Sequence, residues 1–492
     1  MPAPIVHAPG AVSPFGEAFA RIRSEFEIPA GFPAAVDAEA TAVVQRGPAV
    51  QSGGAQPPRA DARDVPLVTI DPPGSLDLDQ AFHAERRGNG FRVHYAIADV
   101  AAFVAPGGAL DRDSFARGVT LYLPDGRAPM LPNVLGEGGA SLLPEQERPA
   151  LLWTIDLDET GAATSARLER ASVRSRAQLD YGGVQASLDQ GDADEPLQLL
   201  RTIGELRRVL EAARGGVSLD LPAQEVVPLS TAGVPTGTFA LEYAAPLPVE
   251  GWNAQISLLA GMEAAKIMIA AGTGILRVVP PPQPWQFDRL RRSARGLGIS
   301  WPRATKWSDV LRSLDRTDPD AAAFLTQAAH LLRGAGYAKL DASNTKDPAA
   351  VPIHAGVAAP YAHVTAPLRR LADRYANEIV LAACAGTAPP EWAIAALDEL
   401  VTTMQAATRR EHAVDRAVVD AVECVVLAPD VGKRFDAYVV DRNKQGVVVQ
   451  LRRPAIVASM AAELALGEPV EVTLVSVDPL ARRIELTPAP DH

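Results

Sequence analysis

The sequence contains little cysteine and lysine, few aromatic residues and no excess of positive charge. Only two of its 492 residues are cysteine, Cys384 and Cys424, which lie far apart in apolar stretches that look helical. Two cysteines cannot complete a zinc site by themselves, so we interpret both as reduced, buried thiols. We also find no run approaching the roughly 20 apolar residues of a membrane span, which argues against a membrane protein.

The net charge of −12 argues against a protein that coats nucleic acid nonspecifically, because such proteins are usually basic. An enzyme that acts on nucleic acid needs only a locally positive channel, and acidic metal ligands add negative charge elsewhere. The first residues, Met1-Pro-Ala-Pro, show no basic-then-apolar leader. We therefore expect a soluble protein in a reducing, cytoplasmic setting.

The pattern of apolar residues changes along the chain and divides it into blocks, since 492 residues exceed one compact core. Residues 13–45 look like one helical stretch, and the turn-rich segment 47–58 is typical of a linker. The C-terminal block alternates like paired strands, with a short helix near Ser459. We predict an N-terminal helical extension with its linker, an α+β body, a helical connector and a β-barrel, at residues 1–60, 61–390, 391–427 and 428–492.

The strongest chemical signal is the acidic segment Thr-Ile-Asp-Pro-Pro-Gly-Ser-Leu-Asp-Leu-Asp-Gln, which begins at Thr69. Asp71 ends an expected strand, while Asp77 and Asp79 are two apart on an extended segment and so point to the same side. We expect the carboxylates to converge, and such hard oxygen ligands suit Mg²⁺ or, second, Mn²⁺. Such an ion can activate water and stabilise the leaving oxygen of a phosphodiester. The alternatives are a solvated acidic turn or a calcium loop, although the residue order of an EF-hand is absent.

This segment resembles the acidic motif of the ribonuclease II/R family, whose catalytic domain is called RNB. Further family motifs follow in the expected order: Ala-Ile-Ala-Asp-Val at 96–100 with Phe-Val at 103–104, Leu-Tyr-Leu-Pro-Asp at 121–125 with Pro-Met-Leu-Pro at 129–132, and Tyr-Ala-His-Val-Thr-Ala-Pro-Leu-Arg-Arg-Leu-Ala-Asp at 361–373. The resemblance spans residues 64 to about 385. It implies a magnesium-dependent enzyme without an organic cofactor. Such enzymes hydrolyse single-stranded RNA processively from a free 3′ end and release nucleoside monophosphates.

One position departs from the family pattern. By resemblance, Asp71, Asp77 and Asp79 bind the metal, and Asp79 is also catalytic. The family motif usually ends in two adjacent aspartates, whereas the second residue here is Gln80. The carbonyl of Gln80 can still coordinate a metal or orient the attacking water, but it brings no negative charge. Either a second ion is held more weakly, or the enzyme is slow.

The basic motif Thr-Ala-Pro-Leu-Arg-Arg is typical of a helix start, with Thr365 as N-cap and Pro367 in the first turn. Arg369 and Arg370 then lie in the first helical turn, where the macrodipole disfavours cations. A bound phosphate reverses that penalty, so we expect this motif to bind RNA. The alternative is an Arg369–Asp373 pair along the helix, worth roughly 0.2–0.5 kcal/mol. By resemblance, Arg369 holds the scissile phosphate and stabilises its transition state.

Further RNA contacts follow from the resemblance. Tyr122 lies between turn residues and a Pro-Met-Leu-Pro stretch, where a core position is the more frequent outcome from sequence alone. The resemblance makes it the aromatic side chain that stacks on a terminal base and sets the length of the end product. Asp415 and Gln255 align loosely with family glutamates, and Asp415 is expected to contact the terminal nucleotide. His363 has no neighbours at metal-ligand spacing and is interpreted as a structural member of its motif.

The C-terminal block resembles an OB-fold of the RNA-binding type found in ribosomal proteins, through the segments 432–440 and 446–451. Its family version usually has a phenylalanine after the glycine, where this chain has Val447. From residue 431 onward, eight arginines and lysines balance eight aspartates and glutamates. We expect weak RNA binding by this barrel alone, because both stacking and electrostatic attraction are reduced.

Three functions remain open on the sequence. The leading hypothesis is a hydrolytic exoribonuclease. The main alternative is a catalytically weak or inactive RNB protein that binds RNA as a regulator, which Gln80 and the acidic charge favour. The joint presence of Asp71, Asp77, Asp79 and Arg369 favours the enzyme, since a pure binder needs no assembled metal site. A metal-dependent phosphodiesterase acting on DNA or small nucleotides is the third hypothesis.

Overall fold

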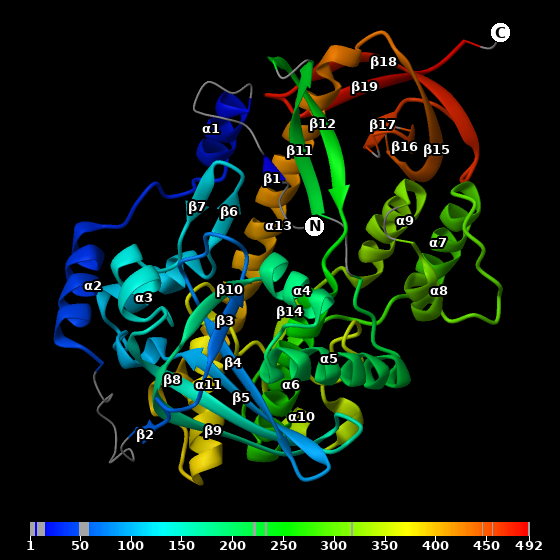
Figure 1. The fold of residues 1–492 in the computed structure, drawn as a ribbon. Helices are drawn as coiled ribbons and strands as arrows, with labels where there is room; N and C mark the ends of the chain where they lie inside the picture. The colour runs from blue at the N-terminus through cyan, green and yellow to red at the C-terminus, as the bar shows by residue number, and fades with distance from the viewer. Residues whose placement is uncertain are drawn as a thin grey trace.

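The fold is that of a computed structural model, shown in Figure 1. It describes residues 5–6, 15–48, 59–219, 223–231, 234–315, 318–444, 446–454 and 456–490. Most of the linker expected at 47–58 lies outside these residues. The described part confirms the α+β class and the closed C-terminal barrel.

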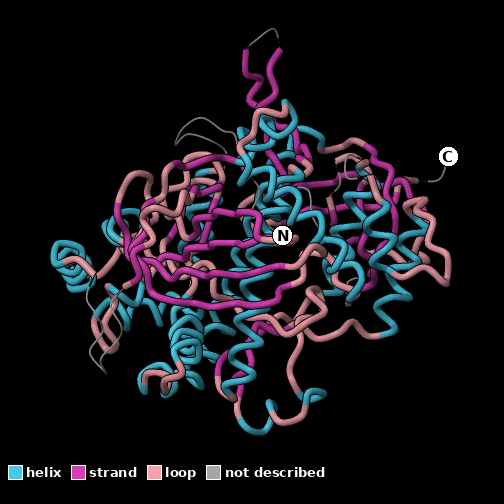
Figure 2. Tube along the Cα trace, turned by 60° about the horizontal axis from the view of Figure 1, so that its bottom comes forward, coloured by secondary structure: helices cyan, strands magenta, loops and turns pink. Residues whose placement is uncertain are grey.

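A seven-stranded sheet forms the centre of the body, in the order β10-β3-β4-β5-β8-β9-β2. Its strands are β10 (Ala177–Asp180), β3 (Val68–Asp71), β4 (Gln80–Arg87), β5 (Gly90–Ala98), β8 (Glu147–Leu157), β9 (Ala163–Arg174) and β2 (Ala60–Asp61). Strands β4, β5, β8 and β9 are an antiparallel meander, whereas β10 and β2 join in parallel at the two edges. Figure 2 shows the strands running side by side. Because β3 pairs with β10 and continues into β4 through segment 72–79, this acidic segment lies at the end of the sheet.

Helices α5 (Glu195–Arg214), α6 (Pro248–Ala271) and α11 (Leu371–Ala385) form a layer on the sheet. Helix α5 packs on β4 and α11 on β9, while the hydroxyls of Tyr95 in β5 and Ser257 in α6 are 2.7 Å apart. Contrary to expectation, α6 is long and apolar enough by composition to cross a membrane. However, 56% of its most apolar window is buried, and it packs between α5 and α11, as is typical of a core helix.

The N-terminal extension is part of the body. The single helical stretch expected at 13–45 is two helices, α1 (Gly16–Glu25) and α2 (Ala34–Arg46), because the chain turns at Glu27, whose φ is +50°. Arg410 fixes this turn by donating to the backbone oxygens of Phe26 and Glu27, at 2.8 and 2.7 Å. Glu39 of α2 accepts from Ala109 N at 2.6 Å, the first residue of α3 (Ala109–Arg117).

A long helix, α13 (Leu397–Leu427), connects the body to the barrel and packs against both. The barrel closes in the order β15-β16-β17-β19-β18. Its strands are β15 (Arg434–Asn443), β16 (Gly446–Leu451), β17 (Val457–Met460), β18 (Pro469–Asp478) and β19 (Arg483–Pro488). The short helix expected near Ser459 is wrong, since Ser459 lies in β17 and pairs with Val448 of β16. Its neighbours Ala458 and Met460 point into the barrel core, an alternation that a strand provides.

Three helices that the sequence patterns did not indicate support the barrel from the side. They are α7 (Pro284–Gly296), α8 (Trp307–Ser313) and α9 (Pro319–Ala329), with their own apolar core. Arg289 of α7 pairs with Asp441 of the barrel at 2.5 Å, and Asp320 of α9 pairs with Arg452 at 2.9 Å. The barrel therefore has fixed contacts besides those with α13.

The remaining elements are short or lie at the edges. Both cysteines are free, with Cys424 buried and Cys384 partly buried. The remaining strands and helices are β1 (Ile5–Val6), β6 (Leu121–Leu123), β7 (Gly126–Ala128), β11 (Ala223–Thr231), β12 (Val234–Ala244), β13 (Gly274–Val278), β14 (Gly336–Leu340), α4 (Tyr181–Gln190), α10 (Ala342–Thr345) and α12 (Glu391–Ala395). The short turns of helix are η1 (Val100–Ala102), η2 (Val134–Gly139), η3 (His330–Leu332), η4 (Pro348–Ala350) and η5 (Ala428–Asp430).

Candidate active site

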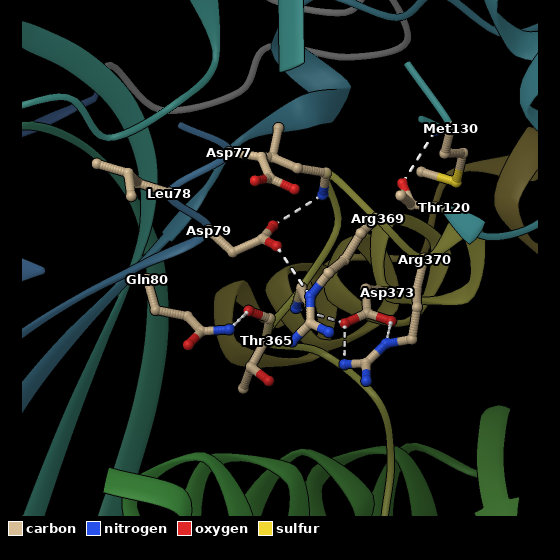
Figure 3. Close-up of polar contacts among 12 residues, drawn as sticks. Asp77, Leu78, Asp79, Gln80, Thr120, Met130, Thr365, Arg369, Arg370 and Asp373 are labelled. Carbon is tan, nitrogen blue, oxygen red and sulfur yellow. Dashed lines mark hydrogen bonds and ion pairs between the residues drawn. The ribbon is translucent and has the colours of Figure 1, made fainter. Parts of the chain in front are cut away.

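The acidic segment connects β3 to β4. Asp71 is the last residue of β3, and a turn follows in which the Ser75 hydroxyl donates to Pro72 O at 2.8 Å. Leu78 is fully buried, and its backbone N donates to Ser141 Oγ at 3.0 Å. Figure 3 shows Leu78 directed away from the two aspartates beside it. This inward anchor leaves Asp77 and Asp79 on the other side of the extended chain, as the spacing predicted.

Asp79 is the most buried of the predicted metal ligands, with only 3% of its surface exposed. Its Oδ1 accepts a hydrogen bond from Leu368 N at 2.8 Å, and its Oδ2 lies 3.5 Å from Arg369 Nε (Figure 3). Oδ2 is buried and accepts no hydrogen bond. Burial raises the pKa of Asp79 to about 8, although Arg369 opposes the shift. The charged form of this carboxylate therefore needs a further cation nearby.

Asp71 has similar surroundings. Burial raises its pKa to about 6, and the charge of Asp77 raises it further. Its Oδ2 is also buried without a hydrogen-bond donor. Asp77 raises the pKa of Asp79 too, so the three carboxylates lie close enough to interact. The two oxygens that accept no hydrogen bond, one on Asp71 and one on Asp79, thus fit a divalent cation, which would offset the burial of both charges.

Asp77 differs from these two in that both of its oxygens have donors. Its Oδ1 accepts from Arg127 Nη1 at 2.5 Å, and its Oδ2 accepts from the Tyr122 hydroxyl at 3.2 Å. Within the part of the chain that the structure describes, no group of three or more acidic, histidine or cysteine side chains is placed to hold a metal ion. In this structure Asp77 thus forms an ion pair with Arg127, and its assignment as a third metal ligand stays a prediction.

Gln80, the first residue of β4, points away from the carboxylates. Its Nε2 donates to the backbone oxygen of Thr365 at 2.5 Å (Figure 3). An aspartate cannot make this contact, since a carboxylate has no hydrogen to donate. Gln80 therefore ties β4 to the basic motif, a role that the sequence pattern did not indicate.

The basic motif is not a helix start. Helix α11 begins at Leu371, and Arg370 has an extended backbone. Residues 367–369 form a turn, Thr120 N donates to Arg369 O at 3.0 Å, and Val119 pairs with Arg370 as an isolated antiparallel bridge. The predictions that Thr365 is an N-cap and that both arginines lie in the first helical turn are wrong. Pairing with segment 118–120 overrides the local helix signal.

The two arginines have different surroundings. Arg370 pairs with Asp373 at 2.9 Å and is largely buried, whereas the side chain of Arg369 is 43% exposed. Asp373, the alternative partner expected for Arg369, thus pairs with Arg370. The Asp373 carboxylate also accepts from Ala366 N at 2.6 Å, which fixes the loop. Arg369 is therefore the arginine that solvent, or a phosphate, can reach.

Tyr122 lies on the β6–β7 hairpin and is 41% exposed, so the core position favoured by its sequence context is wrong. Directly opposite it in the hairpin is Arg127. Arg127 was not among the predicted site residues, because the loop of this hairpin is Pro124-Asp125, whereas an Asp-Gly signal at 125–126 predicts a register in which residues 122 and 127 are not paired. One hairpin thus carries both donors to Asp77.

A cavity of about 110 Å³ lies beside Tyr122 and Arg369. It is lined by Val119, Thr120, Tyr122, Arg277, Tyr337, His363, Arg369, Arg370, Thr408 and Glu411. Arg277, Tyr337 and Glu411 were not predicted, because they come from separate elements with no common motif. His363 has a structural place, since its Nδ1 lies 2.8 Å from the Tyr337 hydroxyl and burial lowers its pKa well below the usual value.

Two loosely aligned residues lie elsewhere. Asp415 is one helical turn beyond Glu411 on α13 and does not line this cavity. Burial raises its pKa to about 7, and the charge of Glu411 raises it further. Gln255 is buried between α6 and α5, where its Nε2 donates to Glu211 Oε2 at 2.7 Å. A second cavity, of about 680 Å³, contains none of the predicted site residues.

The fold and the facing acidic and basic segments are those of an α+β nuclease-type domain joined to an OB-fold barrel. The chain belongs to the RNB domain family, whose family model matches residues 59–386. Residues 433–489 match the RNase II-type exonuclease C-terminal S1 domain.

Several known proteins are similar to this chain. Ribonuclease R of Escherichia coli (strain K12) is 29% identical over 453 residues, which are 86% of this chain and 53% of that protein. The exosome complex exonuclease dis3 of Schizosaccharomyces pombe is 31% identical over 338 residues, covering 66% of this chain and 34% of the relative. The chain spans about half or less of the length of these curated relatives.

Two solved structures share the fold. Mycoplasma genitalium RNase R, in complex with ribose methylated single-stranded RNA, superposes with a TM-score of 0.78 at 19% identity, over 97% of this chain and 78% of that one. Yeast Ssd1, described as a pseudonuclease, gives a TM-score of 0.66 at 15% identity, over 87% of this chain and 54% of that one. An RNase R and a protein described as a pseudonuclease thus share this fold.

Proposed function

We propose that this protein is a hydrolytic 3′-to-5′ exoribonuclease that degrades single-stranded RNA processively to nucleoside monophosphates. The observation that carries the proposal is the pairing of a buried carboxylate with an exposed guanidinium, Asp79 and Arg369, at the end of the sheet. Cleavage of a phosphodiester needs a negative site for a metal ion and a positive group for the phosphate oxygens. The naming of the curated relatives as ribonuclease R and an exosome exonuclease supports RNA as the substrate.

Each side chain has a distinct task in this proposal. Asp71 and Asp79 hold a divalent cation, Mg²⁺ in the first place and Mn²⁺ as second choice, and this ion would activate water and stabilise the leaving oxygen. Arg369 binds the non-bridging oxygens of the scissile phosphate, and Leu368 N fixes the orientation of Asp79. Tyr122 stacks on a base near the 3′ end, which any base allows.

Gln80, Thr365 and Arg370 support the site indirectly. Gln80 and Thr365 join the acidic and basic segments, and Arg370 holds Asp373 and thus the loop that carries Arg369. Thr365 lies before α11, and Arg370, its N-cap residue, is paired with Asp373, so neither is proposed as a phosphate ligand through the helix N-terminus. A contact between Asp415 and the terminal nucleotide, and a cytoplasmic location, stay predictions.

The second candidate is an RNB protein that binds RNA as a regulator without degrading it. Two observations favour it: Gln80 brings no charge to the site, and Asp77 forms an ion pair with Arg127. Yeast Ssd1, which is described as a pseudonuclease, has the same fold.

A time course with a 3′-tailed RNA separates these functions. The full chain is incubated with 5′-labelled RNA in Mg²⁺ and, in parallel, in EDTA, beside a DNA strand of the same sequence. We expect shortening from the 3′ end in Mg²⁺ only, with mononucleotides as the product. Binding without shortening in Mg²⁺ and in Mn²⁺ would establish the regulator instead, and equal attack on DNA would indicate the wider phosphodiesterase class.

A further inference from the structure

The guanidinium of Arg127 lies between two carboxylates. Its Nη1 is 2.5 Å from Asp77 Oδ1, and its Nη2 donates to Glu137 Oε1 in the π-helical turn η2. Only 25% of the Arg127 side chain is exposed, and Asp77 and Glu137 are less exposed still, at 16% and 18%. Partly buried ion pairs of this kind are stronger than those at the surface, because water screens them less.

Asp77 is the central carboxylate of the acidic segment. It lies between Asp71, the last residue of β3, and Asp79, the residue before β4. Both oxygens of Asp77 already have donors, one from Arg127 and the other from Tyr122. A cation that binds Asp77 therefore lies close to the donors of the β6–β7 hairpin, one of which, Arg127, is positively charged.

The formal charges around the site leave room for one divalent cation. The side chains around the site contribute four negative charges, from Asp71, Asp77, Asp79 and Glu137, and two positive ones, from Arg127 and Arg369. The resulting charge of −2 is neutralised by a single divalent cation. Gln80, where the family pattern usually has an aspartate, adds nothing to this total.

We propose that Arg127 is a built-in cation that competes with the divalent metal for Asp77 and thereby sets how tightly this protein binds its metal. The proposal rests on the proposed function only in placing a metal at these carboxylates. When a metal takes Asp77, Arg127 keeps its partner Glu137, so the guanidinium is not left buried and unpaired. The Tyr122 hydroxyl loses its partner at the same time, which links metal binding to the residue proposed to stack on RNA.

The test measures Mn²⁺ binding to the full chain, by electron paramagnetic resonance of free Mn²⁺, without any RNA. Arg127→Gln should bind Mn²⁺ at least about tenfold more tightly than the wild type, because a unit charge a few ångströms from the metal is removed. Arg127→Lys keeps the charge but cannot bridge two carboxylates, so its affinity should fall between the two. In order of increasing Mn²⁺ affinity, we expect the wild type, then Arg127→Lys, then Arg127→Gln.

Arg23→Gln is the matched control. Arg23 of α1 pairs with Asp125 at 2.7 Å and holds the same hairpin from the other side, without contact to Asp77. This variant should bind Mn²⁺ like the wild type. An equal gain in Arg23→Gln would show that loosening the hairpin, rather than removing the competing charge, causes the effect.

A double-mutant cycle with Asp77→Asn adds a second criterion. In that background Arg127 has no carboxylate to compete for, so Arg127→Gln should change the affinity by much less. Thermal unfolding of each variant checks that it is folded. Unchanged or weaker Mn²⁺ binding by folded Arg127→Gln would overturn the proposal.

The failure of this inference and that of the proposed function have different signatures. If the wild type degrades RNA but Arg127→Gln gains no Mn²⁺ affinity, only the role of Arg127 is wrong. If no variant degrades RNA while Arg127→Gln binds Mn²⁺ more tightly, the competition stands and the enzymatic function fails. If no variant binds Mn²⁺ in the millimolar range, the competition is refuted.

Discussion

The α+β body and the C-terminal barrel differ in where they place charge. The body buries Asp99 between Arg59 and Arg170, at 2.7 and 2.5 Å, and these arginines hold the pKa of Asp99 below its usual value although burial opposes them. Among the described residues of the barrel, Gln450 is the only buried polar or charged side chain. The ion pairs within the barrel, such as Arg434–Glu471, lie at the surface.

The difference shows which region depends on exact polar geometry. Buried charges must keep their partners, because an isolated charge in the interior is strongly destabilising. The body therefore holds its acidic and basic segments in fixed positions, with Asp79 and Asp373 each bound to a backbone N–H of the basic loop. The barrel has an apolar core and a surface without net charge, so it tolerates more change. Substitutions in the body should therefore have larger effects than changes to the barrel.

Asp79→Asn should abolish RNA hydrolysis while leaving RNA affinity near normal. The amide keeps the shape but removes a negative charge from the metal position, whereas RNA binding is spread over many phosphates. Product formation is measured on gels, and affinity by fluorescence anisotropy with the same RNA. Full turnover by this variant would contradict the metal assignment.

Arg369→Ala should reduce turnover by about 100- to 1000-fold, with a small change in affinity, because groups that stabilise charge act mostly in the transition state. Single-turnover kinetics at saturating RNA provide the measurement. Arg370→Ala is the comparison, and it should lower the unfolding temperature as well, since it leaves Asp373 buried without its ion pair. A loss of affinity alone would make Arg369 a backbone anchor.

Tyr122→Ala should lengthen the final oligonucleotide and leave the rate on long RNA largely intact. Loss of one stacking surface weakens the grip on short ends by roughly 1–3 kcal/mol. Tyr122→Phe separates the ring from the hydroxyl that contacts Asp77, and should keep the wild-type end product. Sequencing gels resolve the product lengths, and identical lengths for all three proteins would remove Tyr122 from the RNA contact.

Removal of the barrel, residues 428–492, should lower RNA affinity only a few-fold. The barrel has no net charge and lacks the usual aromatic residue, so it offers RNA little electrostatic attraction or stacking. Affinity is measured as a function of salt, with circular dichroism to check the fold. A collapse of binding with a much shallower salt dependence would show that the barrel supplies most phosphate contacts.

Asp415→Asn should raise the unfolding temperature by a few degrees at pH 8 and leave it unchanged at pH 4. Burial raises the pKa of Asp415 to about 7 in the folded protein, above its usual value. The free energy of unfolding of the wild type therefore falls as the pH rises from the usual aspartate pKa to about 7, because the folded state resists the deprotonation of Asp415. The asparagine variant has no proton to lose at this position and shows no such fall. If the wild type and Asp415→Asn have the same unfolding temperature at pH 8 as well as at pH 4, Asp415 is in contact with water.

The sequence by itself determined the elements that depend on local pattern. Alternating apolar residues gave β5 and β8, helical spacing gave α5 and α6, and the shift back to alternation gave the barrel. The ordered family motifs identified Asp71, Asp77, Asp79 and Arg369 as site residues. The predictions of strands and helices succeed because burial in a strand or helix repeats with a fixed period. The assignment of the four site residues, which follows from the resemblance, stays a prediction.

Only the tertiary structure decided which side chains meet. It paired Arg370 rather than Arg369 with Asp373, since the bridge between Val119 and Arg370 prevents an early helix. It placed Arg127 on Asp77 and turned Gln80 toward Thr365. Such contacts join residues far apart in the chain, and their partners depend on strand pairing and loop paths that no local pattern encodes. A charged side chain can bind any opposite charge it reaches, so the fold alone selects its partner.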